Sequence, residues 1–213
     1  MDYVTTTDKT RLYIKDWGTG SPVILIHGWP LSADSWDDQA MAIAEAGYRA
    51  IAYDRRGFGR SSQPWSGYDY DTLADDLAAV IEQTGAADAT LVGFSMGGGE
   101  VARYMSRHGG QSVVKAALIS SVLPYRLKTT DNPAGTEQAA FDKTAQALRD
   151  DRAQFFTEFF RKFFGVGMPS NQVSDELLAW AQSVAMQASL KATIACQKSF
   201  SATDFRGDLA AFK

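Results

Sequence analysis

One stretch decides the fold, Thr90-Leu91-Val92-Gly93-Phe94-Ser95-Met96-Gly97-Gly98-Gly99. It joins a short apolar run, typical of a buried strand, to a segment with helical periodicity, and Gly-x-Ser-x-Gly lies between them. A serine at the tip of so sharp a turn adopts a strained backbone conformation, and small residues at Gly93 and Gly97 let the chain close. The pattern predicts that Ser95 is a nucleophile. A glycine-rich turn between a closely packed strand and helix is the alternative interpretation.

The segments on either side of this stretch alternate between strands and helices. Short apolar runs predict buried parallel strands at Pro22–Ile26, Ala50–Tyr53, Ala89–Gly93 and Lys115–Ser120. Helical periodicity between and after these runs predicts helices over Ser35–Ala46, Thr72–Thr84 and Met96–His108. An antiparallel hairpin is expected before them, at Tyr3–Thr6 and Arg11–Trp17. The alternation predicts an α/β fold with a mostly parallel, doubly wound sheet.

The second half of the chain has a different pattern. Helical segments dominate from Glu137 to Ser201, and no strand-like run appears there. We therefore expect residues 1–123 to form the sheet core, residues 124–203 a helical cap, and residues 204–213 a helix that leads into a further core segment. A sheet that ends at Lys115–Ser120 would have an open apolar edge.

The composition excludes several classes of protein. The chain has 213 residues, 45% of them apolar and 22% charged, with a formal net charge of −4, which is typical of a globular protein with one sizeable core. One cysteine, Cys196, and two histidines give neither a disulfide framework nor a zinc set, so we expect no metal and no other cofactor, and Cys196 should fill the core. Interspersed charges, short apolar runs and an N-terminus without a signal pattern predict a cytoplasmic protein that binds neither nucleic acid nor membranes.

A second loop should meet Ser95. The first of the buried parallel strands runs into His27-Gly28-Trp29-Pro30. Trp29 has a backbone N–H to offer there, since Gly28 permits the turn and Pro30 has no N–H. Met96 has another, because the first turn of a helix leaves its amides unpaired. The two loops together predict an oxyanion hole made by the amides of Trp29 and Met96.

With these motifs the sequence resembles the α/β-hydrolase superfamily, and within it the group of arylesterases, perhydrolases and cofactor-free haloperoxidases. The matching stretches follow the order of the family and are His27–Pro30, Tyr53–Ser62 and Leu91–Arg103. The resemblance implies a serine esterase that forms an acyl-enzyme on Ser95 from small acyl or aromatic esters. It also implies that the amides of Trp29 and Met96 form the oxyanion hole.

Pro30 carries a further implication of the resemblance. In this group a proline after the oxyanion tryptophan goes with perhydrolysis, in which hydrogen peroxide replaces water as the attacker of the acyl-enzyme. The peracid released can oxidise halide without haem or metal. The alternative is that Pro30 only stiffens the loop.

A histidine base and an acidic partner should follow Ser95 in a chain of this family. His108 lies at the far end of the next helix, roughly 20 Å from Ser95 at about 1.5 Å per residue. His27 precedes Ser95 and matches a structural histidine of the family, so it is a weak candidate. Where some relatives carry the acid, after Ser120, stands Ser121-Val122-Leu123-Pro124. The resemblance thus implies that the last two strands and helices of the fold, with the Asp and the His, are absent from this chain.

Several explanations of this gap remain open. We expect a separate C-terminal polypeptide, divided from this chain near Lys213, to supply the Asp and the His. A truncated chain and a swapped homo-oligomer are the alternatives. A protein of another class, a binding protein that keeps the pocket without a base, would also fit. A dinucleotide-binding oxidoreductase is disfavoured, because Gly28-Trp29-Pro30 stands where its glycine fingerprint belongs.

Two further segments are interpreted from their residue types. The loop Asp54–Ser62 lacks the lysine of a phosphate-binding loop and should be structural, with its charged residues bracing neighbouring loops. Phenylalanines recur along one cap helix, and most should pack the cap onto the sheet. By resemblance, Phe159 and Phe163 line a small acyl pocket with Val122, Trp29 and Pro30. Such walls favour short acyl and aromatic esters and offer charged substrates nothing.

Overall fold

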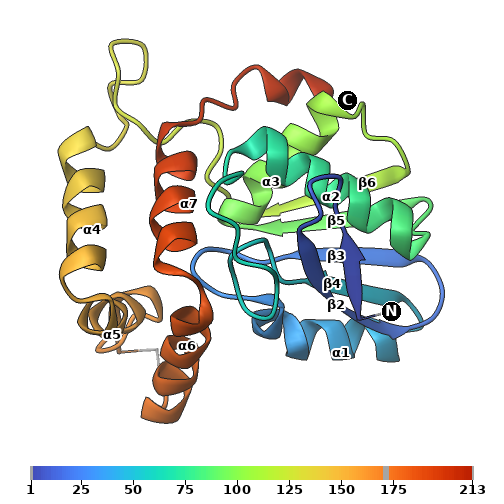
Figure 1. Cartoon of the computed structure of the whole chain (residues 1–213), viewed down its shortest axis with the longest axis horizontal. Coiled ribbons are helices and arrows are strands. Elements are labelled where there is room, and N and C mark those ends of the chain that lie inside the picture. The colour runs from blue at the N-terminus through green and yellow to red at the C-terminus, as the bar shows by residue number, and fades with distance from the viewer. Residues whose placement is uncertain (1, 170–172, 213) are drawn as a thin grey trace.

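A computed structural model of the chain describes residues 2–169 and 173–212. Its sheet has six strands in the order β1-β2-β4-β3-β5-β6 (Figure 1). The strands are β1 (Tyr3–Thr5), β2 (Arg11–Gly18), β3 (Pro22–Ile26), β4 (Arg49–Tyr53), β5 (Ala89–Phe94) and β6 (Val113–Ile119). β2 pairs antiparallel with β1 and β4, and the remaining pairs, β4 with β3, β3 with β5 and β5 with β6, are parallel. The predicted α/β fold with a mostly parallel sheet is confirmed.

The central strands are buried on both faces. On one face Ile24 of β3 belongs to a core cluster with apolar residues of α2 (Tyr70–Thr84) and α3 (Met96–Arg107). On the other face Leu25 packs in a cluster that includes residues of α1 (Asp37–Glu45). Successive side chains of a strand point to opposite faces, so a strand covered by helices on both sides needs a continuous apolar run. This requirement explains why the short apolar runs predicted the strands.

The helix expected over Ser35–Ala46 is divided in the structure. A 3₁₀ helix, η1 (Ala33–Trp36), comes first, and α1 begins only at Asp37. The Asp54 carboxylate accepts a hydrogen bond from the Ala33 backbone N–H at 2.8 Å and holds the start of the segment. This contact from a distant loop favours a tight turn at a place where the spacing of apolar residues predicts a regular helix.

The loop Asp54–Ser62 is structural, as its sequence indicates. Asp54 is fully buried, and its Oδ2 accepts a hydrogen bond from the backbone N–H of Arg60 at 2.8 Å. In the same loop, the guanidinium of Arg56 donates to both carboxylate oxygens of Asp76 on α2, each at 2.6 Å. These bonds fix the loop between η1 and α2.

Four helices form a cap beside the sheet, at the left of Figure 1. They are α4 (Gln138–Asp150), α5 (Arg152–Phe163), α6 (Asp175–Gln187) and α7 (Leu190–Ala202). Asp151, Ser174 and Ser189 each accept a hydrogen bond from an N–H in the first turn of the helix that follows them. The helix expected over residues 204–213 is a short 3₁₀ helix, η2 (Asp208–Ala211), and Lys213 lies outside the described residues.

β6 lies at the edge of the sheet. Its Val114, Leu118 and Ile119 side chains are 59%, 38% and 42% exposed. These values are high compared with those of the central strands, where apolar side chains such as Ile24 and Leu25 of β3 are almost fully buried. An edge of this kind offers unpaired backbone groups and apolar side chains to another strand. The open apolar edge expected from the sequence is therefore present.

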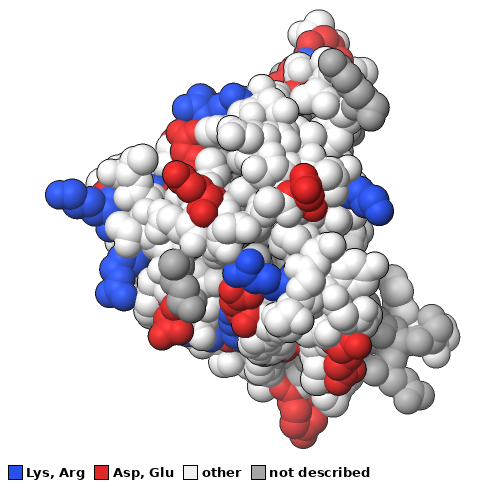
Figure 2. Space-filling model, turned by 90° about the vertical axis from the view of Figure 1, so that its right-hand side faces the viewer, with Lys and Arg blue, Asp and Glu red and all other residues white. Residues whose placement is uncertain are grey.

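The surface carries both signs of charge. Figure 2 shows basic and acidic side chains interspersed on the face that it turns to the viewer. In the described part of the chain, no helix is both long and apolar enough to cross a membrane.

Candidate active site

Ser95 occupies a sharp turn between β5 and α3. Its backbone has φ 52° and ψ −113°, a conformation that costs a non-glycine residue free energy. Three hydrogen bonds hold it: the Ser95 N–H donates to the Ile119 carbonyl at 2.9 Å, and the Ser95 carbonyl accepts from the N–H groups of Gly98 at 3.1 Å and Val122 at 3.2 Å. The ends of β6 and α3 that meet here thus enforce the turn, and the partly exposed Ser95 side chain has no hydrogen-bond partner among the described residues.

The glycines on either side of Ser95 are required by close backbone contacts. A Cβ atom on Gly93 would lie 2.6 Å from the Gly97 carbonyl oxygen. A Cβ atom on Gly97 would collide with the Ile26 carbonyl oxygen of β3. The Gly-x-Ser-x-Gly spacing therefore reflects the contact of α3 with β5 and β3.

The loop after β3 comes within van der Waals distance of Ser95. A Cβ atom on Gly28 would lie 3.2 Å from the Ser95 Cβ and 2.7 Å from the Phe94 ring. Trp29, only 7% exposed, donates its indole N–H to the Thr193 carbonyl of α7 at 2.9 Å. The structure thus brings the loop that carries Trp29 close to the Ser95 turn, which Met96, the first residue of α3, directly follows.

His27 is fully buried beside this loop, and both of its ring nitrogens are engaged. Nε2 accepts a hydrogen bond from the Arg55 backbone N–H at 3.0 Å, and Nδ1 lies 2.9 Å from the Gly28 carbonyl oxygen. Nδ1 must carry the proton, because a carbonyl oxygen can only accept. Burial, together with the nearby Arg55 guanidinium, holds the pKa of His27 well below its usual value of 6.5. His27 therefore has no free nitrogen with which to take a proton from Ser95.

A buried ion pair supports the same loop from below. The Arg55 guanidinium pairs with the Glu100 carboxylate of α3, and both side chains are fully buried. Arg55 also donates to the His27 carbonyl at 2.6 Å, while the Tyr53 hydroxyl donates to Glu100 at 2.8 Å. This network ties α3 to the loop after β3, the two segments that flank Ser95.

His108 is also occupied elsewhere. Its Nε2 lies 2.8 Å from Oδ1 of Asp75 on α2, and its ring stacks on Tyr104. It caps the C-terminal end of α3, as the sequence indicates, and Ser95 stands before the opposite end. Both histidines of the chain are therefore accounted for by contacts that exclude Ser95.

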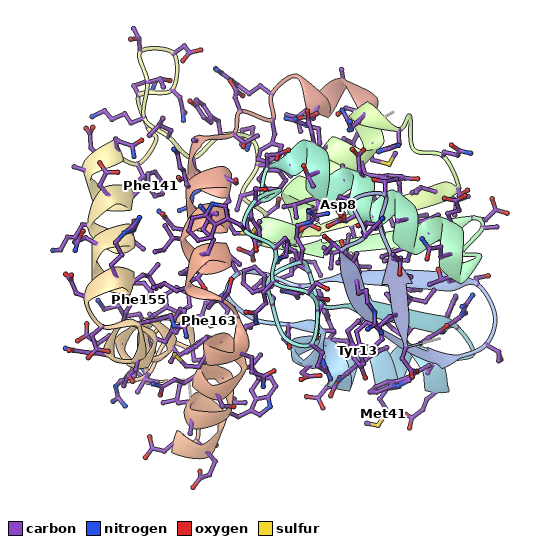
Figure 3. The ribbon with its side chains drawn as sticks, viewed as in Figure 1. Asp8, Tyr13, Met41, Phe141, Phe155 and Phe163 are labelled. Atoms are coloured by element: carbon purple, nitrogen blue, oxygen red, sulfur yellow. The ribbon has the colours of Figure 1, made fainter. Side chains whose placement is uncertain are left out.

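Ser95 opens into a cavity of about 320 Å³ between the sheet and the cap. It is lined by Trp29, Ser95, Val122, Arg126, Phe141, Thr144, Phe155, Phe159, Phe163, Gln197 and Phe200. Figure 3 shows that Phe141 and Phe155 come from cap helices and that Phe163 lies between them and the sheet. Val122, Phe159 and Phe163, expected to form a pocket with Trp29, do share the wall of this cavity. Pro30 does not: it is buried in a turn closed by the hydrogen bond from Leu31 N–H to the Gly28 carbonyl.

Sequence reasoning missed the polar part of this wall. The expectation that the pocket offers nothing to a charged substrate is wrong, because Arg126 lines it. Thr144 and Gln197 were not anticipated either, since helical periodicity identifies the apolar face of a cap helix without showing which polar residues reach the same cavity. A signal for Arg126 existed: it follows the carboxyl end of β6, where parallel sheets place ligand sites.

Comparison with known proteins places this geometry in a family. Residues 21–176 match the model of the family described as alpha/beta hydrolase fold. The chain belongs to the α/β-hydrolase family. This α/β hydrolase is 47% identical over 214 residues to a putative non-heme chloroperoxidase of Synechocystis, a match that covers 98% of the chain and 77% of the relative. It is 44% identical to a bifunctional esterase/perhydrolase of Acinetobacter calcoaceticus, covering 96% of the chain and 75% of the relative.

A solved structure agrees with these matches. The crystal structure of a bromoperoxidase from Bacillus anthracis superimposes on this α/β hydrolase with a TM-score of 0.94 at 46% identity. The match covers 99% of the chain and 77% of the bromoperoxidase. The sequence resemblance to the esterase, perhydrolase and haloperoxidase group is thus confirmed, and the chain spans 77% of the length of these relatives.

Proposed function

We propose that the chain is the nucleophile-bearing part of a serine esterase. The observation that carries this proposal is the strained Ser95, held by three backbone hydrogen bonds at the wall of a largely apolar cavity. Ser95 Oγ attacks the carbonyl carbon of a small acyl or aromatic ester and loses its proton to a base. The oxyanion accepts hydrogen bonds from the amides of Trp29 and Met96, the alcohol leaves, and an acyl-enzyme remains.

The base comes from outside the residues described above. His27 and His108 are committed to other contacts, and no Asp or Glu belongs to the described cavity wall. We infer that a C-terminal polypeptide carrying two further strands pairs along β6 and brings an Asp and a His to Ser95. The exposed apolar residues of β6 and the greater length of the relatives support this inference.

Perhydrolysis is the second activity of the proposed site. Hydrogen peroxide attacks the carbonyl carbon of the acyl-enzyme in place of water, Ser95 leaves as the alcohol, and a peracid forms. The peracid transfers one oxygen to a halide and becomes a carboxylic acid. A relative named esterase/perhydrolase and others named chloroperoxidase support this assignment, with Pro30 next to Trp29 as the residue that favours peroxide.

Complementation tests the esterase proposal. We expect the chain alone to hydrolyse p-nitrophenyl acetate very slowly, and the separately expressed C-terminal segment of the Synechocystis relative to raise the rate by roughly 10³-fold or more, the scale of losing a triad member. Ser95→Ala should abolish this gain and the labelling by a fluorophosphonate, whereas Ser66→Ala, at an exposed serine outside the cavity, should keep both.

Two outcomes contradict the proposal in different ways. Full activity of the chain alone would disprove the need for a second polypeptide. If the segment co-elutes with the chain, but the complex neither hydrolyses the ester nor is labelled at Ser95, the alternative of a binding protein without a catalytic base would be favoured. A segment whose histidines are replaced by alanine is the matched control, because it should bind and give no gain in rate.

The proline has its own test. In the complemented enzyme, Pro30→Leu should lower the ratio of peracid formation to hydrolysis of p-nitrophenyl acetate several-fold. Peracid is measured by iodide oxidation in the presence of peroxide and a short-chain ester. An unchanged ratio would remove Pro30 from the proposal and leave the esterase activity untouched.

A further inference from the structure

The Ser95 cavity has two walls of different chemistry. Phe155, Phe159 and Phe163 of α5 form an aromatic wall. Polar residues from other elements face the same space: Arg126 from the loop after β6, Thr144 from α4 and Gln197 from α7. An occupant that fills the cavity therefore has an apolar body on one side and a polar group on the other.

Arg126 is the charged member of this wall and has no partner. Its guanidinium makes no hydrogen bond or ion pair with any residue that the structure describes, and its side chain is exposed. Three other arginines of the fold illustrate the contrast, because each has an acidic partner: Arg55 pairs with Glu100, Arg56 with Asp76 and Arg103 with Asp208. No acidic side chain appears in the described part of the cavity wall, so the positive charge at Arg126 is uncompensated there.

Among the polar side chains of this wall, Arg126 is the one best able to bind an anion. The Thr144 hydroxyl donates to the Ala140 carbonyl of its own helix at 3.1 Å. One amide hydrogen of the nearly buried Gln197 is directed to the Phe141 carbonyl at 3.3 Å. The guanidinium, by contrast, has all of its N–H donors available, in a planar arrangement that matches the two oxygens of a carboxylate.

We propose that Arg126 forms a subsite for a carboxylate carried by the substrate, so that the cavity takes half-esters of small aromatic or aliphatic dicarboxylic acids. The body of the acid lies against the phenylalanines, and the free carboxylate accepts hydrogen bonds from Arg126. A single arginine matches the single charge of a carboxylate, whereas a phosphate monoester would bring nearly two charges to one cation. The hydrolysis of such esters rests on the proposed function, but the binding of the carboxylate does not.

Binding to the Ser95→Ala chain tests the subsite without any need for catalysis. The probes are monomethyl terephthalate, which carries a carboxylate, and methyl 4-carbamoylbenzoate, a neutral amide of nearly the same shape. Calorimetric titration should show that the carboxylate binds roughly threefold to tenfold more tightly than the amide. This range corresponds to the contributions of an exposed ion pair and of a charge-assisted hydrogen bond. High salt should reduce the preference, because ions screen an exposed pair.

Substitution assigns the preference to one residue. Arg126→Gln should equalise the two affinities by weakening the carboxylate only, and Arg126→Lys should keep part of the preference. The matched control is Arg149→Gln, since Arg149 is exposed and likewise without a partner in the described residues but does not line the cavity. This control should leave both affinities unchanged.

Three results would overturn the subsite: equal affinities in the parent chain, failure of the carboxylate probe to bind at millimolar concentration, or the same loss of preference in the Arg149→Gln control. A preference that disappears with Arg126→Gln, found in a chain that no segment activates, would instead keep the subsite and contradict the esterase. In a complemented enzyme the same substitution should raise KM for the half-ester and leave kcat unchanged, the signature of binding that is equal in ground state and transition state.

Discussion

His27 shows how a single buried side chain sets a requirement on pH. It is fully buried as the neutral form, and both nitrogens are committed to backbone groups. A protonated ring would lose the bond from the Arg55 N–H and would place a second positive charge beside the Arg55 guanidinium. The folded chain therefore binds a proton at His27 much less readily than the unfolded chain, whose histidines titrate near pH 6.5.

The sign of this linkage leads to a prediction. Below pH 6.5 the unfolded chain takes up a proton that the folded chain refuses, so stability falls as the pH falls. Between pH 7.5 and 5.5 we expect His27 alone to lower the free energy of unfolding by about 1.4 kcal/mol. Urea unfolding of two proteins at both pH values measures this loss: His27→Gln should be less stable at pH 7.5, yet it should lose about 1.4 kcal/mol less than the parent chain on acidification. The comparison is needed because Asp76, whose pKa burial raises to about 6, titrates in the same range in both proteins. Parallel pH dependence of the two proteins would contradict it.

Residues also show where sequence reasoning stops. Ser95, its glycines and the Trp29 loop were predictable because each follows from a local backbone requirement of the strand-to-helix turn. Arg126, Thr144 and Gln197 were not, because they reach the cavity from a loop and two cap helices whose packing no local pattern encodes. The buried pair of Arg55 and Glu100 likewise joins residues far apart in the chain.

At the scale of an element, three glycines follow Met96 in the first turn of α3, although helix propensity disfavours glycine. Each costs about 1 kcal/mol relative to alanine in a helix interior. The space explains the choice: a Cβ atom on Gly99 would lie 2.6 Å from the Tyr70 ring and 2.7 Å from the Phe205 ring. The glycines thus lower the intrinsic stability of the helix, but they allow close contact with α2 and with the segment that follows the cap.

This packing account predicts that replacing glycine by alanine changes the free energy of unfolding in opposite directions at two positions. Gly99→Ala should lower the free energy of unfolding by about 1–3 kcal/mol, as overpacking of a core does. Gly207 has a helical φ of −66°, and among the described residues no atom beyond its chain neighbours lies within 4 Å of the position that a Cβ would take, so Gly207→Ala should stabilise by about 0.4–1 kcal/mol. Urea unfolding of both variants measures the pair, and a neutral Gly99→Ala would disprove the packing account.

Elements were predicted well where burial is symmetrical. The parallel strands β3, β4 and β5 lie between two helical layers, so their apolar runs identified them to within a residue or two. The start of α1 and the last helical segment were predicted less well. Asp54 holds the segment before α1, and Arg103 holds Asp208 of η2, so both are shaped by contacts from elsewhere in the fold. Such contacts change the type and length of a helix without altering its apolar spacing.

At the scale of the whole molecule, Trp29 connects the sheet core with the cap. Its ring makes edge contacts with Phe155, Phe156, Phe159 and Phe200, and its indole N–H reaches Thr193. The residue whose backbone is proposed to stabilise the oxyanion is therefore held by side chains of α5 and α7. Trp29 thus links the cap helices to the loop beside the Ser95 turn, and the contact between Phe94 and Phe163 makes a second link.

The proposed pairing along β6 would also have a practical use. If strand pairing along β6 completes the catalytic centre, then release of a chromophore reports the meeting of two polypeptides. Fusing each to one member of an interacting pair would convert their proximity into colour, with a signal set by mass action. The weaker the intrinsic affinity along that strand, the better such a reporter would distinguish a true association from chance encounter.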